Sequence, residues 1–361
     1  MTSIKENLRQ TIFLFFLGVP LLLLVSACTD SSSEDTSGGG EAMGEASGEE
    51  EETNEAEVED ESEGAEELVE TKQITSWFPQ VENAGQYYAA MEGFYEEEGL
   101  DMTVEPGGPE VSSVQIVASG QAEYGMAQAD QMLSAVNDGI PLVAIFTNFQ
   151  TTPQGIMFHE GEPVENFDDL ADGYDIYTAP GAGYWEYLVE TTDIEQEQNM
   201  VYNGSNSEFM SNEKAASQMY VTSEPFYLEQ EGVETDYLTI AESGYSPYGD
   251  VLFTTQEHLE ENPEEVQAFV NAVTKGWEAF KEEPAPLYSY LMGLQDGLSE
   301  EQMAYATEEM QELVYGGDAE VNGVGYMSEQ RWQTLIDQMT DLGLIEEGMA
   351  PEDIYTTEFL Q

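Results

Sequence analysis

Few residues in this sequence have the types and spacing of a catalytic or metal site. The two histidines, His159 and His258, stand about a hundred residues apart, with no cysteine or carboxylate spacing that makes a zinc site. Neither a G-x-S-x-G elbow nor a P-loop lysine motif occurs. The glycine-rich residues 181–186 could turn backbone N–H groups toward a ligand, although a tight strand-to-helix turn explains them equally well. The sequence therefore favours a binding protein over an enzyme, and it predicts no metal and no cofactor.

The charge of the chain excludes whole classes of partner. Its 361 residues contain 7 Lys and Arg against 75 Asp and Glu, a formal net charge of -68. Nucleic acids and anionic lipid surfaces need a basic face, which so few cations cannot build. A hydrophobic content of 40% is enough for folded cores, and the length predicts about two domains. We interpret the acidic surface as a halophilic adaptation, since high salt screens such repulsion, with a cationic partner as the alternative.

Residues 1–28 have the order of a secretory signal. Lys5 and Arg9 precede an apolar run over residues 12–24, and small residues lead to Cys28, the one cysteine of the chain. The run is too short for a stable membrane span. The segment resembles the lipobox of bacterial lipoproteins, which implies that Cys28 is lipidated. The alternative is an ordinary signal peptide followed by a free cysteine. Either way we expect an extracytoplasmic protein, and the lipobox implies a lipid anchor in the cell membrane.

Residues 29–70 predict an acidic, disordered tether. This stretch holds 18 Asp or Glu, no Lys or Arg, and few large apolar side chains. Such a composition cannot bury enough surface to offset the entropy of ordering, and its like charges repel. A cation buffer is the alternative, but the spacing of a calcium loop is missing.

Beyond residue 70, short apolar runs alternate with helical patterns. This alternation is typical of α/β folds with a mainly parallel sheet covered by helices. The pattern resets after Pro153, and the last third of the chain is helical. We expect strands at 74–78, 101–104, 124–127, 142–146, 156–158, 175–178, 219–222 and 237–241, and helices at 84–99, 111–119, 131–137, from Pro263, from Ser299 and from Ser328 to Gly343.

Several segments together resemble one family of binding proteins. They are WFPQVENAGQYYAA (77–90), GFYEEEGLD (93–101), VASGQAEYG (117–125), GIPLVAI (139–145), QTTPQG (150–155), FDDL (167–170), TSEPF (222–226) and residues 262–277. The family includes binding proteins for the thiamine pyrimidine precursor, taurine, alkanesulfonates and nitrate. The resemblance covers nearly all of residues 73–345.

This resemblance implies a solute-binding protein of an ABC importer with the type II periplasmic-binding-protein fold. Two α/β lobes, joined by a two-strand hinge, would close around one small molecule. The first lobe would comprise residues 71–160 plus 247–361, and the second residues 161–246. A monomer would deliver its ligand to an ABC permease and its ATPase, and it would be held at the membrane through the N-terminal lipid.

The ligand site is expected in the cleft, at strand ends and helix starts. By position in the family motif, Trp77, Asn83 and Tyr87 face the ligand, with the rings stacking and the amide hydrogen-bonding. The other candidates are polar or aromatic residues that follow expected strands of the two lobes: Gln128, Asp130, Gln150, Tyr184, Trp185 and Glu224.

These candidates supply acids, amides and aromatic rings but almost no Lys or Arg. They favour a heteroaromatic ligand with amino groups, such as a hydroxymethylpyrimidine or another thiamine precursor, over an anion that needs cationic donors. Taurine, a sulfonate or nitrate remains the alternative ligand. A pyrimidine-synthase-like enzyme of the same superfamily would need a cysteine-rich motif, which this chain lacks. A scaffold or sensory lipoprotein without a substrate is the third alternative.

Overall fold

The computed structural model describes residues 68–108, 111–179 and 181–360. These residues belong to one compact unit. The predicted signal, Cys28 and the predicted tether up to residue 67 lie outside the described residues. The tether was predicted to end at residue 70, but Val69 and Glu70 already belong to the first strand.

The first lobe is built on a five-stranded sheet whose strands come from both ends of the chain. Three strands on one side are mutually parallel, whereas β10 runs antiparallel to both of its neighbours. The strand order is β2 (Leu100–Glu105), β1 (Val69–Ile74), β3 (Tyr124–Ala127), β10 (Gly249–Thr255) and β4 (Leu142–Phe149).

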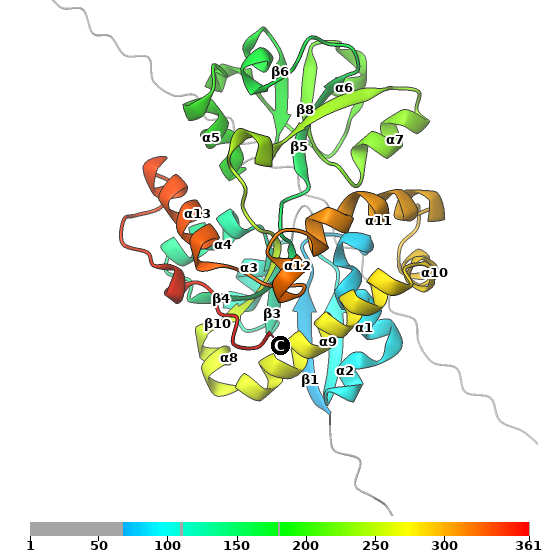
Figure 1. Cartoon of the computed structure of the whole chain (residues 1–361), viewed down its shortest axis with the longest axis vertical. Coiled ribbons are helices and arrows are strands. Elements are labelled where there is room, and N and C mark those ends of the chain that lie inside the picture. Colours follow the sequence, from blue (N-terminus) through cyan, green and yellow to red (C-terminus); the bar gives the residue numbers. More distant parts are fainter. Residues whose placement is uncertain (1–67, 109–110, 180, 361) are drawn as a thin grey trace, which may run out of the picture. The chain divides into compact units, whose positions relative to one another are not determined.

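The second lobe repeats this arrangement with strands from the middle of the chain. Here β5 is the antiparallel strand in the fourth position. The order is β7 (Asn199–Val201), β6 (Asp175–Thr178), β8 (Ala215–Tyr220), β5 (Gln154–His159) and β9 (Thr235–Thr239). Figure 1 shows the second lobe above the first. The mixed α/β fold with two lobes agrees with the expected fold class.

Two connections join the lobes, one between β4 and β5 and one leading into β10. The first crossing therefore lies at residues 150–153, because β5 pairs within the second sheet. The sequence prediction had kept residues up to 160 in the first lobe. The reset seen after Pro153 marked this crossing more accurately than that boundary did. The rest of the expected division between lobes stays a prediction.

Helices cover both faces of the first sheet. On one face the core joins Tyr124 and Met126 of β3 to α1 (Ala84–Glu92), α9 (Pro263–Glu282), α10 (Ala285–Leu294) and α11 (Glu300–Tyr315). On the other face, Ala127 packs with α3 (Ser113–Ala118), α4 (Ala129–Asn137) and α13 (Glu329–Asp341). Tyr124 and Met126 face one side of the sheet and Ala127 the other, because successive side chains of a strand point to opposite faces. In the second lobe the helices are α5 (Gly183–Thr191), α6 (Ser207–Ser211) and α7 (Glu224–Gln230).

Helices α1 and α9 approach each other at two glycines. A Cβ atom at Gly276 would overlap the carbonyl oxygen of Gly85, and one at Gly85 would overlap the indole of Trp277. The Trp277 indole N–H donates to Asn148 Oδ1 at 3.1 Å, and this bond holds the ring in place beside Gly85. As expected, the Trp277 and Trp332 side chains lie in the core.

Most expected elements are present, with differences in their bounds. The strand expected over 219–222 is β8, which ends at Tyr220, and the one expected over 237–241 is β9, which ends at Thr239. The first strand covers Val69–Ile74, not 74–78, because Thr71 and Gln73 turn inward while Trp77 and Phe78 stay exposed. The helix expected over 84–99 is interrupted by Gly93, whose φ of 77° ends α1 before the short α2 (Phe94–Glu97). Strands β7 and β10 were not expected.

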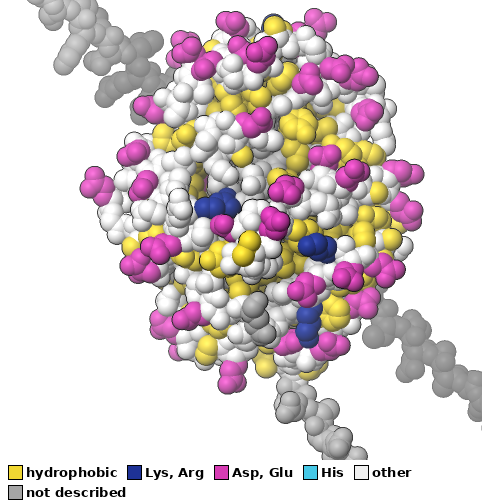
Figure 2. Space-filling view, viewed as in Figure 1, with side chains coloured by type: hydrophobic (Ala, Val, Ile, Leu, Met, Phe, Trp, Pro, Cys, Tyr) yellow, Lys and Arg dark blue, Asp and Glu magenta, His cyan; other side chains and the backbone are white. Residues whose placement is uncertain are grey.

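The surface is acidic throughout the visible face. Figure 2 shows Asp and Glu side chains spread over both lobes, with few Lys or Arg side chains between them. Within the described ranges, no helix has the length and apolar character needed to cross a membrane.

Candidate ligand-binding cleft

Three carboxyl groups form the centre of the candidate site, and we call them the carboxyl cluster. Glu82 lies in the short 3-10 helix Val81–Asn83, which leads directly into α1. Asp250 lies at the start of β10. Glu224 is the first residue of α7 in the second lobe. The charges of Asp250 and Glu224 both act on Glu82, so the cluster spans the two lobes.

Glu82 is the most deeply buried member, with 2% of its surface exposed. Its Oε1 accepts a hydrogen bond of 2.6 Å from the Thr222 hydroxyl of the second lobe. Its Oε2 is buried and has no hydrogen-bond partner among the residues that the structure describes. Burial, with smaller contributions from Asp250 and Glu224, raises the pKa of Glu82 to about 7. This carboxyl therefore has one buried oxygen without a hydrogen-bond partner among the described residues.

Asp250 combines burial with an unusual backbone. Its φ of 46° makes it the one non-glycine residue in the left-handed region among the described residues. Residues held in that region concentrate at functional sites, where surrounding contacts impose the conformation. The Gln128 side-chain amide donates to Asp250 Oδ1 at 3.1 Å and to the Tyr220 hydroxyl at 3.2 Å. Burial raises the pKa of Asp250 to about 6.

Glu224 is partly exposed as a residue, but its carboxyl is desolvated and its pKa is raised. Its Oε2 accepts from the backbone N–H of Tyr220 at 2.8 Å. No ion pair of the described residues involves any member of the carboxyl cluster. The partners of these carboxyls are hydroxyl, amide and backbone groups, so their negative charge is left without a cation.

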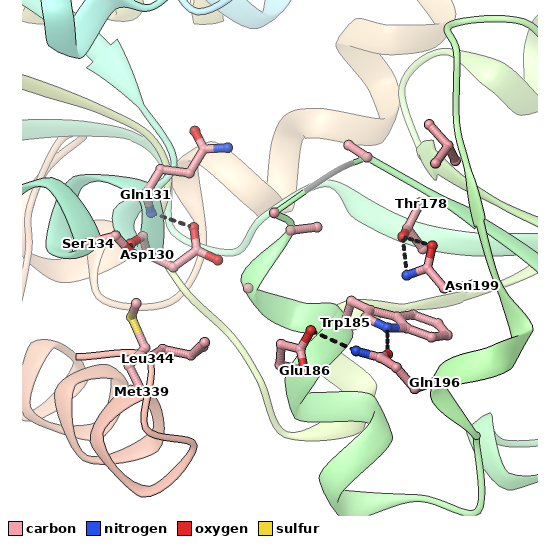
Figure 3. Close-up of a pocket in the computed structure, with 15 residues that line it drawn as sticks. Asp130, Gln131, Ser134, Thr178, Trp185, Glu186, Gln196, Asn199, Met339 and Leu344 are labelled. Atoms are coloured by element: carbon pink, nitrogen blue, oxygen red, sulfur yellow. Dashed lines mark hydrogen bonds between the residues drawn. The ribbon is translucent and has the colours of Figure 1, made fainter. Parts of the chain in front are cut away.

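A pocket of about 600 Å³ lies beside the cluster and also borders both lobes. Asp130, on the first turn of α4, forms one wall together with Ser134 (Figure 3). Asp130 Oδ2 accepts from the Tyr245 hydroxyl at 3.0 Å, and its Oδ1 accepts from the backbone N–H of Gln131 at 2.8 Å. Burial raises the pKa of Asp130.

The opposite wall belongs to the second lobe. The Trp185 indole N–H donates to Gln196 Oε1, and the Gln196 amide donates to Glu186 Oε1 at 3.0 Å (Figure 3). Nearby, the Asn199 amide donates to the Thr178 hydroxyl at 3.0 Å. These bonds hold the polar side chains of this wall in fixed positions.

The structure brings five of the predicted site residues into this region. Gln128 and Glu224 contact the same residue, Tyr220, from the two lobes. Asp130 and Trp185 line the pocket. Tyr184 links the pocket to Tyr220. The charge of Asp130 contributes to the raised pKa of Tyr184, and Tyr184 in turn contributes to the raised pKa of Tyr220. The Tyr184 hydroxyl donates to Gln218 Oε1 at 3.1 Å.

The other four predicted residues differ in placement. Trp77 is 41% exposed, and its ring meets that of Phe78 edge to face with 5.5 Å between the centroids. Asn83 is buried, and neither atom of its amide has a partner in the described structure. Tyr87 packs into the core of the first lobe. Gln150 lies at the crossing between lobes, where its amide donates to the carbonyl of Tyr326 at 2.8 Å. No contact joins Tyr87 or Gln150 to the cluster within the described residues.

Sequence reasoning did not select Glu82, Tyr220, Thr222 or Asp250. Glu82 stands inside the motif at 77–90, next to Asn83, and an acid at that place was an available signal. Asp250 had no such signal, because its position depends on the pairing of β10 with strands more than a hundred residues away. Among the described residues, no group of three or more His, Cys, Asp or Glu has the geometry to hold a metal ion.

The fold is that of periplasmic binding proteins. The aliphatic sulphonate binding protein SsuA from Escherichia coli superposes with a TM-score of 0.61 at 13% identity, covering 82% of this chain and 94% of that protein. At 12% identity the desulfurization enzyme DSZB has the same fold, with a TM-score of 0.55 and coverage of 81% and 97%. The fold thus defines a class of proteins with two α/β lobes, which includes both binding proteins and an enzyme.

The sequence assigns the chain within that class. The family model described as NMT1/THI5 like matches residues 80–286, and the chain belongs to this family. The formylaminopyrimidine-binding protein of Halalkalibacterium halodurans is 24% identical over 81% of this chain and 91% of its own length. The riboflavin-binding protein RibY of Chloroflexus aurantiacus is 22% identical over 79% and 84%. Family and fold together make the chain a substrate-binding protein of an ABC importer. The expectation that it is not an enzyme agrees with the binding functions for which both relatives are named.

Proposed function

We propose that this protein captures a small heteroaromatic nutrient with amino groups, similar to hydroxymethylpyrimidine or another thiamine precursor. The ligand is bound between the lobes and passed to an ABC permease and its ATPase. The observation that carries the proposal is the free, buried Oε2 of Glu82 within a carboxyl cluster that has no cation.

The chemistry of the cluster selects the class of ligand. An ionised carboxylate only accepts hydrogen bonds, and it does so most strongly from charged or amino donors. An amino group or protonated ring nitrogen would satisfy Glu82 Oε2 and offset the charges of Asp250 and Glu224. A sulfonate or nitrate would instead add a negative charge to a group of acids, which costs free energy at short range.

Aromatic side chains around the cluster suit a planar ligand. The Trp77 side chain is exposed, and the Tyr220 hydroxyl bonds to Gln128 within the cluster. Aromatic rings stack on flat ligands in offset or edge-to-face arrangements that add to the free energy of burial. The two relatives named for formylaminopyrimidine and riboflavin support a heteroaromatic ligand, since both molecules are heteroaromatic.

The place of action follows from the N-terminal sequence. We propose that Cys28 carries the lipid anchor, that the acidic residues up to 67 keep the binding domain clear of the membrane, and that the protein works as an extracytoplasmic monomer. The acidic surface suits a habitat of high salt, where the Debye length falls to about 3 Å at 1 M.

Calorimetry of the soluble form in about 1 M salt tests the ligand class. We expect heat from 4-amino-5-hydroxymethyl-2-methylpyrimidine or thiamine and none from taurine or nitrate. The Glu82→Gln variant should bind the aminopyrimidine at least tenfold more weakly, whereas Glu320→Gln, on an exposed helix, should bind as wild type does. Tight taurine binding without pyrimidine heat would overturn the proposal in favour of an anion-binding protein. Contacts with a permease that persist when Glu82 and Trp77 are replaced would favour a scaffold instead.

A further inference from the structure

The pocket beside the carboxyl cluster is larger than a single-ring ligand requires. A cavity of about 150 Å³ is enough to bind benzene. The pocket between α4, α13 and the start of α5 has about 600 Å³ of space, within the range of sites for drug-sized ligands. An aminopyrimidine held by Glu82 and Asp250 would therefore leave most of this space empty.

Neighbouring residues at the start of α4 contribute to the cluster and to the pocket. Gln128, the N-cap residue, faces the cluster through its bond to Asp250. Asp130 and Gln131, two and three positions later, line the pocket. Successive residues of a helix turn by about 100°, so this one turn presents side chains to both spaces. A ligand bound at the cluster could thus extend along α4 into the pocket.

The walls of the pocket differ in chemistry. Met339 and Leu344 make one side apolar, and the labelled side chains in Figure 3 place them opposite Glu186 and Trp185. The other side offers amide and hydroxyl groups from Thr178, Gln196 and Asn199. Lys and Arg do not occur among the described residues that line the pocket, whereas Asp130 and Glu186 do. This lining suits a group with an apolar face and hydroxyl or amide substituents, and it disfavours a phosphate.

We propose that the pocket is a second subsite for the same ligand. The ligand is then an extended heteroaromatic molecule, with an amino-bearing ring at the carboxyl cluster and a second ring or hydroxylated chain without negative charge beside Trp185 and Asn199. This inference rests on the proposed function and specifies the size and charge of its ligand.

Substitution of Ser134 tests the subsite without altering the cluster. Ser134 lines the pocket, and its hydroxyl donates to the backbone carbonyl of Asp130. The Ser134→Phe variant should fill the space, and Ser134→Ala is the matched control that adds no bulk. Calorimetry would compare a single-ring aminopyrimidine with thiamine and riboflavin, and each of these with its phosphate ester.

We expect wild type to bind at least one of the two extended, unphosphorylated probes at least tenfold more tightly than the single ring. Ser134→Phe should abolish that difference and leave the affinity for the single ring unchanged. Leu344→Trp, which adds bulk to the pocket from the apolar side next to α13, should have the same effect and serves if Ser134→Phe does not fold. Equal affinities of all rings for wild type, equal losses for all rings in the variants, or preference for the phosphate esters would overturn the second subsite. A response to taurine alone would instead overturn the proposed function itself.

Discussion

Glu82 and Thr222 are joined by a hydrogen bond of 2.6 Å, although they lie 140 residues apart and in different lobes. Glu82 precedes the first helix of one lobe, and Thr222 follows a strand of the other. This bond and the Gln128 contact with Tyr220 tie the lobes together at the carboxyl cluster. The site is therefore formed by both lobes together and not by either lobe alone.

Removing the Thr222 hydroxyl should weaken binding. Thr222→Val leaves Glu82 Oε1 buried without a donor, and an unsatisfied buried group costs about 1–3 kcal/mol. We expect the affinity for an aminopyrimidine to fall by about 5- to 150-fold by calorimetry, since about 1.4 kcal/mol is tenfold. Thr334→Val, at an exposed position of α13, is the control. An unchanged affinity in Thr222→Val would mean that the bond has no role in closure.

The pKa of Glu82 predicts a dependence of stability on pH. The folded protein retains a proton on this carboxyl up to about pH 7, whereas an unfolded glutamate releases it near 4.5. Its contribution to stability is therefore fully present below pH 4.5 and is lost as pH rises through about 7. Unfolding followed in urea between these limits should show that Glu82→Gln loses less stability than wild type, by on the order of 3 kcal/mol. Parallel curves for Glu82→Gln, wild type and the Glu320→Gln control would contradict this.

Asp250 allows its charge and its backbone to be tested separately. Asn tolerates the left-handed region, whereas Ala pays roughly 1–2 kcal/mol there. Both Asp250→Asn and Asp250→Ala should bind an aminopyrimidine more weakly than wild type. In addition, the melting temperature of Asp250→Ala should be lower than that of Asp250→Asn. Equal melting temperatures, measured by differential scanning calorimetry, would show that the φ of 46° stores no strain.

The crossing of α1 and α9 should not accept a methyl group. Gly276→Ala forces these helices apart at Gly85. We expect this overpacking to lower the free energy of unfolding by about 1–3 kcal/mol. Gly293→Ala is the matched control, because its Cβ would meet nothing and alanine stabilises a helix by roughly 0.5–1 kcal/mol. Urea unfolding should therefore move in opposite directions for the two variants, and a shift in the same direction would be inconsistent with a close crossing.

The acidic surface should make stability depend on salt. Raising the ionic strength from about 0.1 M to about 1 M shortens the Debye length from about 10 Å to about 3 Å and screens the repulsion among the carboxylates. We expect the melting temperature of the ligand-free protein to rise over this range. A melting temperature that is flat or falls with salt would argue against adaptation to high salt.

The sequence predicted those elements of the fold whose own residues carry a clear strand pattern or helix cap. Strands β3 and β6 begin and end where expected, and Ser299 caps α11 by accepting from the backbone N–H of Gln302. β1 was misplaced because its inward residues, Thr71 and Gln73, are polar, whereas the apolar Trp77 and Phe78 are exposed. β10 was not predicted, although the run from Val251 to Thr255 has the apolar and β-branched residues typical of a strand.

The site was predictable only in part. Polar residues at strand ends led to Gln128, Asp130 and Glu224, which stay predicted ligand contacts; the structure places Gln128 and Glu224 in contact with Tyr220 and Asp130 in the pocket lining. The charge of the cluster depends on burial, which residue types do not show: Glu82 is 2% exposed in a chain whose other acids mostly face solvent. Tyr87 could not be separated from Tyr88 by pattern, and both lie in the core.

The order of strands also determines when each lobe can fold. All five strands of the second sheet come from residues 154–239, so that sheet can form as soon as this segment has been made. In the first sheet, β10 lies between β3 and β4. Until residue 255 is available, β3 and β4 each have an unpaired edge on the side where β10 will pair. Unpaired edges invite wrong pairing with other chains. The middle of the protein is thus expected to fold before its beginning, and an exported chain would need protection until β10 inserts.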